Sequence, residues 1–153
     1  KQLRVARKQA QAYIDQYFEQ YPGVKEYMET TREFARENGY VETVFGRRLY
    51  LPDINAKNHN MRQYAERTAI NAPMQGTAAD IIKLAMISVD SWLAKRNDIK
   101  MVMQVHDELV FEVEESVLEI STDEICRIMQ DVAELKVPLV VDAGVGKNWA
   151  LAH

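Results

Sequence analysis

The sequence is poor in the residues that cross-link, interrupt or anchor a chain. It has a single cysteine, Cys126, among 153 residues, which excludes an internal disulfide and favours a reducing compartment. Its 4 prolines and 6 glycines form no low-complexity stretch. No apolar run is long enough to span a membrane, and no signal peptide is visible. With 47% hydrophobic residues the chain can bury a core, so we expect one domain, or part of a larger protein, since the first residue is Lys1 and not Met.

Basic residues are scarce in the last third of the chain. Residues 101–153 carry 3 Lys and Arg against 11 Asp and Glu, a net charge of −8. Residues 1–100 carry 16 against 12, a net charge of +4, although the whole chain is acidic at −4. Either the basic part faces phosphates and the acidic part holds cations, or the asymmetry is only solvated surface.

The most informative pattern is the run Met101–Val113. Apolar residues alternate on each side of a His-Asp-Glu tip. Each segment is therefore expected to place one set on a single face, namely Met101, Met103 and Val105 before the tip, and Leu109, Phe111 and Val113 after it. Alternation on both sides of a short polar turn predicts an antiparallel β-hairpin.

Two adjacent carboxylates, Asp107 and Glu108, fall at the predicted turn. Like charges a few Å apart repel unless a cation offsets them, so a turn that offers both into a cleft is a candidate divalent-metal site. The alternative is structural, because Asp is common in turns, where its side chain bonds the local backbone. The hairpin pattern by itself favours the structural interpretation, so the choice depends on the rest of the chain.

Periodicity and turn signals predict the remaining elements. Helices are expected over residues 8–21, 24–38, about 61–93 and about 115–133. A short hairpin is expected around Gly46, and a last short strand at Pro138–Asp142. This order predicts an α+β fold with antiparallel pairing, not alternating βαβ units.

The long helix should have an apolar stripe and a kink near Pro73, which lacks a backbone donor. The stripe is expected to consist of Ile70, Met74, Ala78, Ile81, Ala85, Val89 and Trp92. The shorter helix over 115–133 should bury Val117, Ile120, Ile125, Ile128 and Met129.

A second, polar face of the long helix has Arg67, Asn71 and Gln75 at intervals of four residues. A step of four residues rotates by only about 40° around a helix, so the three side chains share one narrow face. Long hydrogen-bonding groups without an acid suit the DNA minor groove, where every base pair presents acceptors at purine N3 or pyrimidine O2. The alternative is an ordinary solvated helix face.

Longer motifs resemble one family. Glu66–Asp80 is similar to the long palm helix of family A DNA polymerases, the bacterial DNA polymerase I type, and Gln104–Glu108 resembles the catalytic hairpin of that family, called motif C. The segments Tyr21–Val24 and Gly46–Pro52 resemble its fingers region, and Gly146–His153 resembles its C-terminus. The resemblance covers essentially the whole chain.

The resemblance implies part of a template-directed polymerase that transfers nucleotides to a primer 3′-hydroxyl with two Mg²⁺ ions. Asp107 would be the catalytic metal ligand, and Glu108 a neighbouring carboxylate with an auxiliary role. DNA contacts would come from His106 at the primer terminus, from Arg67, Asn71 and Gln75 in the minor groove, and more weakly from Gln104. The implied partners are primer–template DNA and deoxynucleoside triphosphates, in the bacterial cytoplasm at the nucleoid and with no membrane.

The resemblance further implies a partial fingers region, residues 1–60, and a partial palm, residues 61–153. The family's motif A, ending Asp-Tyr-Ser-Gln-Ile-Glu, and its nucleotide-binding fingers helix do not occur in the sequence. The metal site is therefore expected to be incomplete and the isolated chain inactive. Asp142 matches a position that is not catalytic in the family. An unpaired hairpin edge would favour self-association of the chain.

Two other functions fit parts of the pattern. A non-catalytic DNA-binding module would use the basic part alone. An HD-type phosphohydrolase would use the doublet His106-Asp107, but that chemistry places the doublet on a helix and needs further ligands. Only His59 and His153 remain as other histidines.

Overall fold

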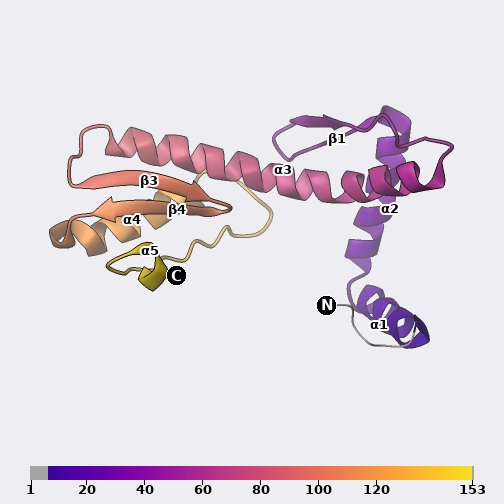
Figure 1. Cartoon of the computed structure of the whole chain (residues 1–153), viewed down its shortest axis with the longest axis horizontal. Helices are drawn as coiled ribbons and strands as arrows, with labels where there is room; N and C mark the ends of the chain where they lie inside the picture. Colours follow the sequence, from indigo (N-terminus) through magenta and orange to yellow (C-terminus); the bar gives the residue numbers. More distant parts are fainter. Residues whose placement is uncertain (1–6, 153) are drawn as a thin grey trace. The chain divides into compact units, whose positions relative to one another are not determined.

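The computed structural model describes residues 7–152, and its elements follow one another as Figure 1 shows. The chain forms two compact units, Lys1–Gly76 and Thr77–His153, and each is described by itself. Helices and two small antiparallel hairpins confirm the α+β class predicted from the sequence. In residues 7–152, no helix combines the length and apolar character that a membrane crossing requires.

The first unit begins with two helices, α1 (Arg7–Gln20) and α2 (Pro22–Asn38). Pro22 starts the second helix, where its missing N–H costs nothing. Gly39 ends α2 in the left-handed conformation, with φ of 77°, and its N–H donates to the carbonyl of Ala35 at 2.8 Å. The predicted helix end is thus confirmed, and it is of the type that glycine favours.

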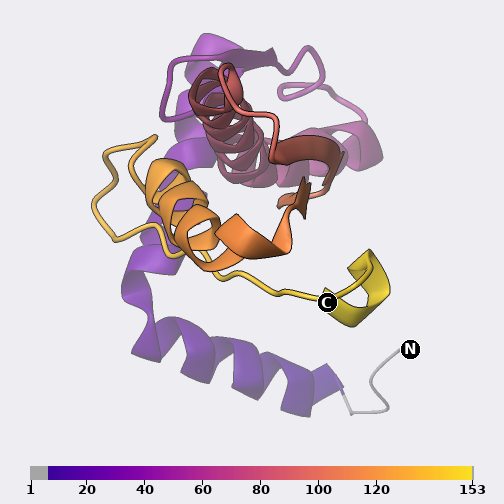
Figure 2. The ribbon, with the colours of Figure 1, turned by 90° about the vertical axis from the view of Figure 1, so that its left-hand side faces the viewer.

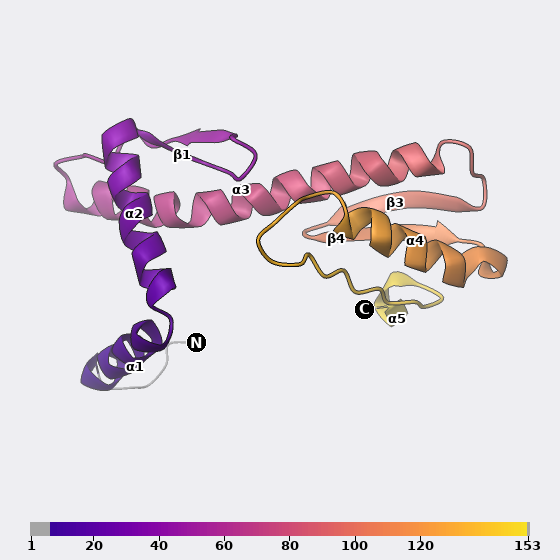
Figure 3. The ribbon, with the colours of Figure 1, turned by 180° about the vertical axis from the view of Figure 1, so that it is seen from behind.

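A short hairpin follows, made of β1 (Tyr40–Glu42) and β2 (Arg48–Tyr50). Its turn uses Gly46 with φ of 78°. Figure 3 shows this hairpin running beside the N-terminal half of helix α3 (His59–Leu93). The core between these elements is small and consists of Ala35, Val41, Leu51, Ile54, Ala65 and Ala69.

Helix α3 is continuous through Pro73. The Asn58 side chain caps its start by accepting hydrogen bonds from the N–H groups of Asn60 and Met61, at 2.9 and 3.4 Å. The predicted apolar stripe is wrong at Met74, which is 66% exposed. Small residues, Ala65 and Ala69, face the core of the first unit instead.

The second unit contains the predicted hairpin of β3 (Ile99–Val105) and β4 (Glu108–Val113). Met101 pairs with Phe111, but Met103 already pairs with Val110, so β3 has one extra residue, a β-bulge. The expectation that Met101 and Met103 share a face is therefore wrong. From Met103 onwards, each residue of β3 lies on the opposite face of the sheet from the one that strict alternation from Met101 would give it.

The rest of the second unit is a 3₁₀ turn, η1 (Glu115–Val117), and helices α4 (Leu118–Gln130) and α5 (Trp149–Ala152). Helix α4 buries Ser121 and Ile125, whereas Ile120, predicted to be buried, is 75% exposed.

The predicted last strand at Pro138–Asp142 is wrong. Figure 2 shows this stretch as irregular chain between α4 and α5. A strand is stable only when a neighbouring strand receives its hydrogen bonds, and in the described part of this unit β3 and β4 pair only with each other. Val140, at 70% exposed, is left in solvent.

Candidate functional site

Three polar side chains form an exposed row on α3. Arg67, Asn71 and Gln75 all lie within the first unit, and each is exposed. Across residues 7–152, no hydrogen bond or ion pair engages any of these three side chains. The row therefore presents unused N–H donors at one spacing along one helix face.

The acid next to this row is held by an arginine of α2. The Arg36 guanidinium donates to a carboxylate oxygen of Glu66 at 2.8 Å. This hydrogen bond lowers the pKa of Glu66 below its ordinary value of 4.5, against an opposing effect of partial burial. Because Arg36 neutralises Glu66, the charge of the adjacent Arg67 remains available to an external anion.

The tip of the β3–β4 hairpin is a two-residue turn. Val105 pairs with Glu108, so His106 and Asp107 form the loop between the strands. His106 has φ of 53°, and it is the one non-glycine residue with positive φ in the described chain. Tight hairpin turns require positive φ at this position. A left-handed residue other than glycine costs about 1–2 kcal/mol, and such strain clusters at functional sites.

The side chain of Gln104 closes this turn. Its amide nitrogen donates to the backbone carbonyl of His106 across the loop. Gln104 and Asp107 therefore lie at the same hairpin tip, where Gln104 bonds the backbone of the turn.

The two carboxylates of the tip differ in exposure. Asp107 lies in the loop and is exposed, whereas Glu108 is the first residue of β4 and is half-buried. Asp107 can thus reach a bound group more readily than Glu108 can.

The donor set of the tip suits Mg²⁺, which prefers oxygen ligands and keeps several waters. Asp107 and Glu108 would hold it, but within residues 7–152 no group of three His, Cys, Asp or Glu side chains is placed to bind a metal. Asp142, the other carboxylate considered, lies near Cys126. Its charge adds to burial and to Asp123 in raising the pKa of that thiol.

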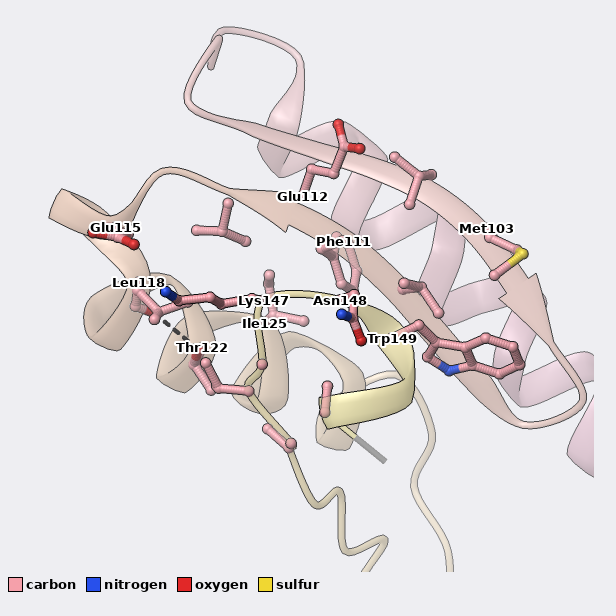
Figure 4. A pocket seen from close by; sticks show the side chains of 18 of the residues that line it. Met103, Phe111, Glu112, Glu115, Leu118, Thr122, Ile125, Lys147, Asn148 and Trp149 are labelled. Carbon is pink, nitrogen blue, oxygen red and sulfur yellow. Dashed lines mark hydrogen bonds between the residues drawn. The ribbon is translucent and has the colours of Figure 1, made fainter.

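A separate cavity of about 870 Å³ lies in the second unit between the β3–β4 hairpin, α4 and the C-terminal segment. Figure 4 shows Phe111, Ile125 and Trp149 contributing to its walls from these three elements. Its lining includes neither the loop residues His106 and Asp107 nor the flanking pair Val105 and Glu108. The cavity is therefore distinct from the predicted site.

One contact near the row was not anticipated from the sequence. Arg47, in the β1–β2 turn, donates to the backbone carbonyl of Gly76 on α3 at 3.0 Å. The available signal was the glycine itself, since an isolated Gly in a helical pattern usually has a packing reason.

Comparison with known proteins assigns a family to these features. The family model described as DNA polymerase family A matches residues 1–151. The DNA polymerase I of Pseudomonas aeruginosa is 61% identical over 154 residues, which is 100% of this chain and 17% of that protein. The DNA polymerase I of Streptococcus pneumoniae is 51% identical over 96% of this chain. The chain thus spans about a sixth of the length of these curated relatives.

A solved structure has the same fold. The POL domain of Pol1 from M. smegmatis, in complex with DNA primer-template and dNTP, matches with a TM-score of 0.93 and 41% sequence identity. The match covers 97% of this chain and 26% of that chain.

Proposed function

The chain belongs to DNA polymerase family A, and from that premise we propose that it supplies part of a template-directed DNA polymerase site. The observation that carries the proposal is the family match over residues 1–151, which includes both the exposed row on α3 and the acidic hairpin tip. The reaction is transfer of nucleotides to a primer 3′-hydroxyl, in DNA replication and repair. The partners are primer–template DNA and deoxynucleoside triphosphates.

The row on α3 would bind the minor groove of the primer–template. Arg67, Asn71 and Gln75 are exposed donors at helical spacing, and the minor groove offers acceptors at equivalent positions in all base pairs. Such contacts bind any sequence, yet they depend on correct pairing. His106 would contact the primer terminus, with Gln104 fixing the turn that carries it.

The hairpin tip would supply a catalytic carboxylate. Asp107 is the exposed acid that would hold Mg²⁺, with Glu108 in an auxiliary role. In the intact enzyme, Mg²⁺ held by these carboxylates would supply the charge that lowers the pKa of the 3′-hydroxyl and stabilises the leaving pyrophosphate. In-line phosphoryl transfer needs chiefly positioning and charge stabilisation, which these residues provide without a covalent step on the protein.

The chain would not complete this reaction alone. A two-metal site requires carboxylates from separate segments, and the second carboxylate motif of the family does not occur in the sequence. We assign residues 1–60 to a partial fingers region and residues 61–153 to a partial palm. The location in this proposal is the bacterial cytoplasm, which the bacterial sources of the relatives support.

Primer extension tests the catalytic part. The chain, Asp107→Ala and the control Asp142→Ala are given a recessed duplex, Mg²⁺ and four nucleotides. We expect no extension from any of them, because one carboxylate set is missing. Extension that is lost in Asp107→Ala would overturn the expected inactivity, and joint loss in Asp142→Ala would identify the second carboxylate.

A non-catalytic DNA-binding module is the second candidate, favoured by the exposed row on α3 alone. An HD-type phosphohydrolase fits poorly, because His106-Asp107 lies in a hairpin loop instead of on a helix. Of its other candidate ligands, His59 begins α3 and His153 lies outside the described residues. Phosphohydrolase activity abolished by His59→Ala would revive that alternative.

A further inference from the structure

The β1–β2 turn holds α3 directly beside its polar row. Arg47 donates from its guanidinium to the carbonyl oxygen of Gly76 at 3.0 Å. A Cβ atom on residue 76 would lie 2.6 Å from the Thr43 methyl carbon and 3.4 Å from the Arg47 guanidinium. The first distance is shorter than van der Waals contact allows, so the turn fits against a bare Cα.

Thr43 has little freedom to move away from this contact. Its side chain is buried, and its hydroxyl accepts a hydrogen bond from the Arg47 N–H at 3.2 Å. Its backbone N–H donates to the Arg47 carbonyl at 2.9 Å, and its carbonyl accepts from Gly46 at 2.9 Å. These three hydrogen bonds hold Thr43 in place, and with it the methyl group that faces Gly76.

Helix α3 has low intrinsic stability in the segment that the β1–β2 turn contacts. Pro73 has no N–H, so one backbone hydrogen bond of α3 is missing there. Gly76 is the poorest helix former after proline. These two residues flank Gln75, and Asn71 lies one turn before it, so the end of the polar row depends on support from outside the helix.

We propose that Thr43 and Arg47 are positioning residues, which hold the Asn71–Gly76 turn of α3 so that Asn71 and Gln75 meet the minor groove in one register. This inference rests on the proposed function, because it presupposes minor-groove binding by the row. Neither residue needs to touch the bases. Their effect passes through the backbone of Gly76.

The test measures how much a single minor-groove acceptor contributes to the affinity of the chain for a DNA duplex. Each protein is titrated against a labelled primer–template duplex and against the same duplex in which C–H replaces purine N3 near the primer end. The ratio of the two affinities is the readout. Phosphate contacts affect both duplexes equally, so a lost charge or a general loss of binding leaves the ratio unchanged.

For the unchanged protein we expect the modified duplex to bind about 3- to 10-fold more weakly, the loss of one hydrogen bond. Gly76→Ala pushes against Thr43 without altering charge, and its ratio should fall towards 1. In the double variant Gly76→Ala/Thr43→Ser the methyl group is removed while the hydroxyl remains. The double variant should therefore recover the ratio, because the clash between the two side chains is gone.

A second pair of variants covers the case in which Gly76→Ala does not fold. Arg47→Lys keeps a donor for the Gly76 carbonyl and should retain the ratio, whereas Arg47→Met keeps the aliphatic stem and should lower it. If the unchanged protein discriminates and Gly76→Ala or Arg47→Met discriminates equally well, the positioning role is wrong and minor-groove binding stands. If the unchanged protein does not discriminate at all, minor-groove binding itself fails, and this inference fails with it.

Discussion

Arg67 owes its availability to a neighbouring ion pair. Glu66 precedes it directly on α3, and an unengaged carboxylate there would compete with DNA phosphates for the arginine. The Arg36 guanidinium of α2 forms an ion pair with that carboxylate, with 2.8 Å between nitrogen and oxygen. A single contact between two helices thus affects both stability and the local potential at the proposed DNA face.

Arg36→Met should lower the stability of the chain near neutral pH. The folded-state pKa of Glu66 is depressed, chiefly by the hydrogen bond from Arg36, so the stabilisation is fully present above pH 4.5 and is lost as the pH falls through the lower folded value. Both side chains are partly exposed, which limits the effect to about 0.5–1 kcal/mol. Thermal unfolding at neutral pH and near pH 3 measures it.

The matched control is Lys25→Met on the same helix. Lys25 and Glu29 are both more than half exposed and 4.0 Å apart, so their pair should contribute little at either pH. An Arg36→Met effect that persists unchanged near pH 3 would contradict the assignment to Glu66.

At the scale of elements, the end of α2 depends on a glycine. Gly39→Ala should destabilise the chain by about 1–2 kcal/mol, because a Cβ is strained at φ of 77° although no atom lies within 4 Å of its position. Gly23→Ala is the control, since it has equally open space and no positive φ inside a helix. Denaturant unfolding should show no loss for the control. Equal losses for both variants would refute the backbone explanation.

Elements with a local signal were predictable from the sequence. The end of α2 follows from Gly39, the first turn from Gly46, and the β3–β4 hairpin from alternation around a polar tip. These features depend on neighbours in the chain, which the sequence displays directly. The family was also predicted correctly from the sequence, because the motifs that resemble family A DNA polymerases are long.

Features that depend on distant partners were not predictable. The bulge in β3 falls within Met101-Val102-Met103, where every residue is apolar, so either face accommodates the shift. The predicted last strand has no neighbouring strand to pair with in the described structure, and Met74 is exposed while Ala65 and Ala69 face the core. The hydrogen bond from Arg47 to the Gly76 carbonyl joins residues 29 positions apart, and no local sequence pattern predicts a contact over that separation.

At the scale of the whole molecule, we expect self-association through the second unit. The β3–β4 sheet has two strands, so both of its edges present unpaired backbone groups in the described structure. Val102 lies at the bulge and is 48% exposed. Val102→Lys should reduce association at high micromolar concentration, as measured by sedimentation velocity, because an edge lysine opposes strand addition.

The control for that measurement is Ile87→Lys, which replaces an apolar residue of α3 that is 64% exposed. It adds the same charge away from the sheet. A protein that is monomeric without either substitution, or one that responds equally to both, would contradict association through the strand edge.

Charge is distributed unevenly over the whole chain, with the acidic excess in the part that contains the hairpin tip and the basic excess in residues 1–100. A protein with net charge −4 is repelled by DNA on average, so binding must come from local groups. Arg67 is the charged member of the exposed row, and its removal should therefore affect binding more than removal of another cation on the same helix.

Duplex binding by fluorescence anisotropy, as a function of salt, tests the central claim most directly. We expect affinity that falls steeply with salt, that is similar for different sequences, and that drops by about 1–3 kcal/mol in Arg67→Ala. Lys83→Ala, which removes an exposed charge further along α3, should have a smaller effect. Strong preference for one sequence, or equal losses in Arg67→Ala and Lys83→Ala, would contradict a minor-groove face on this helix.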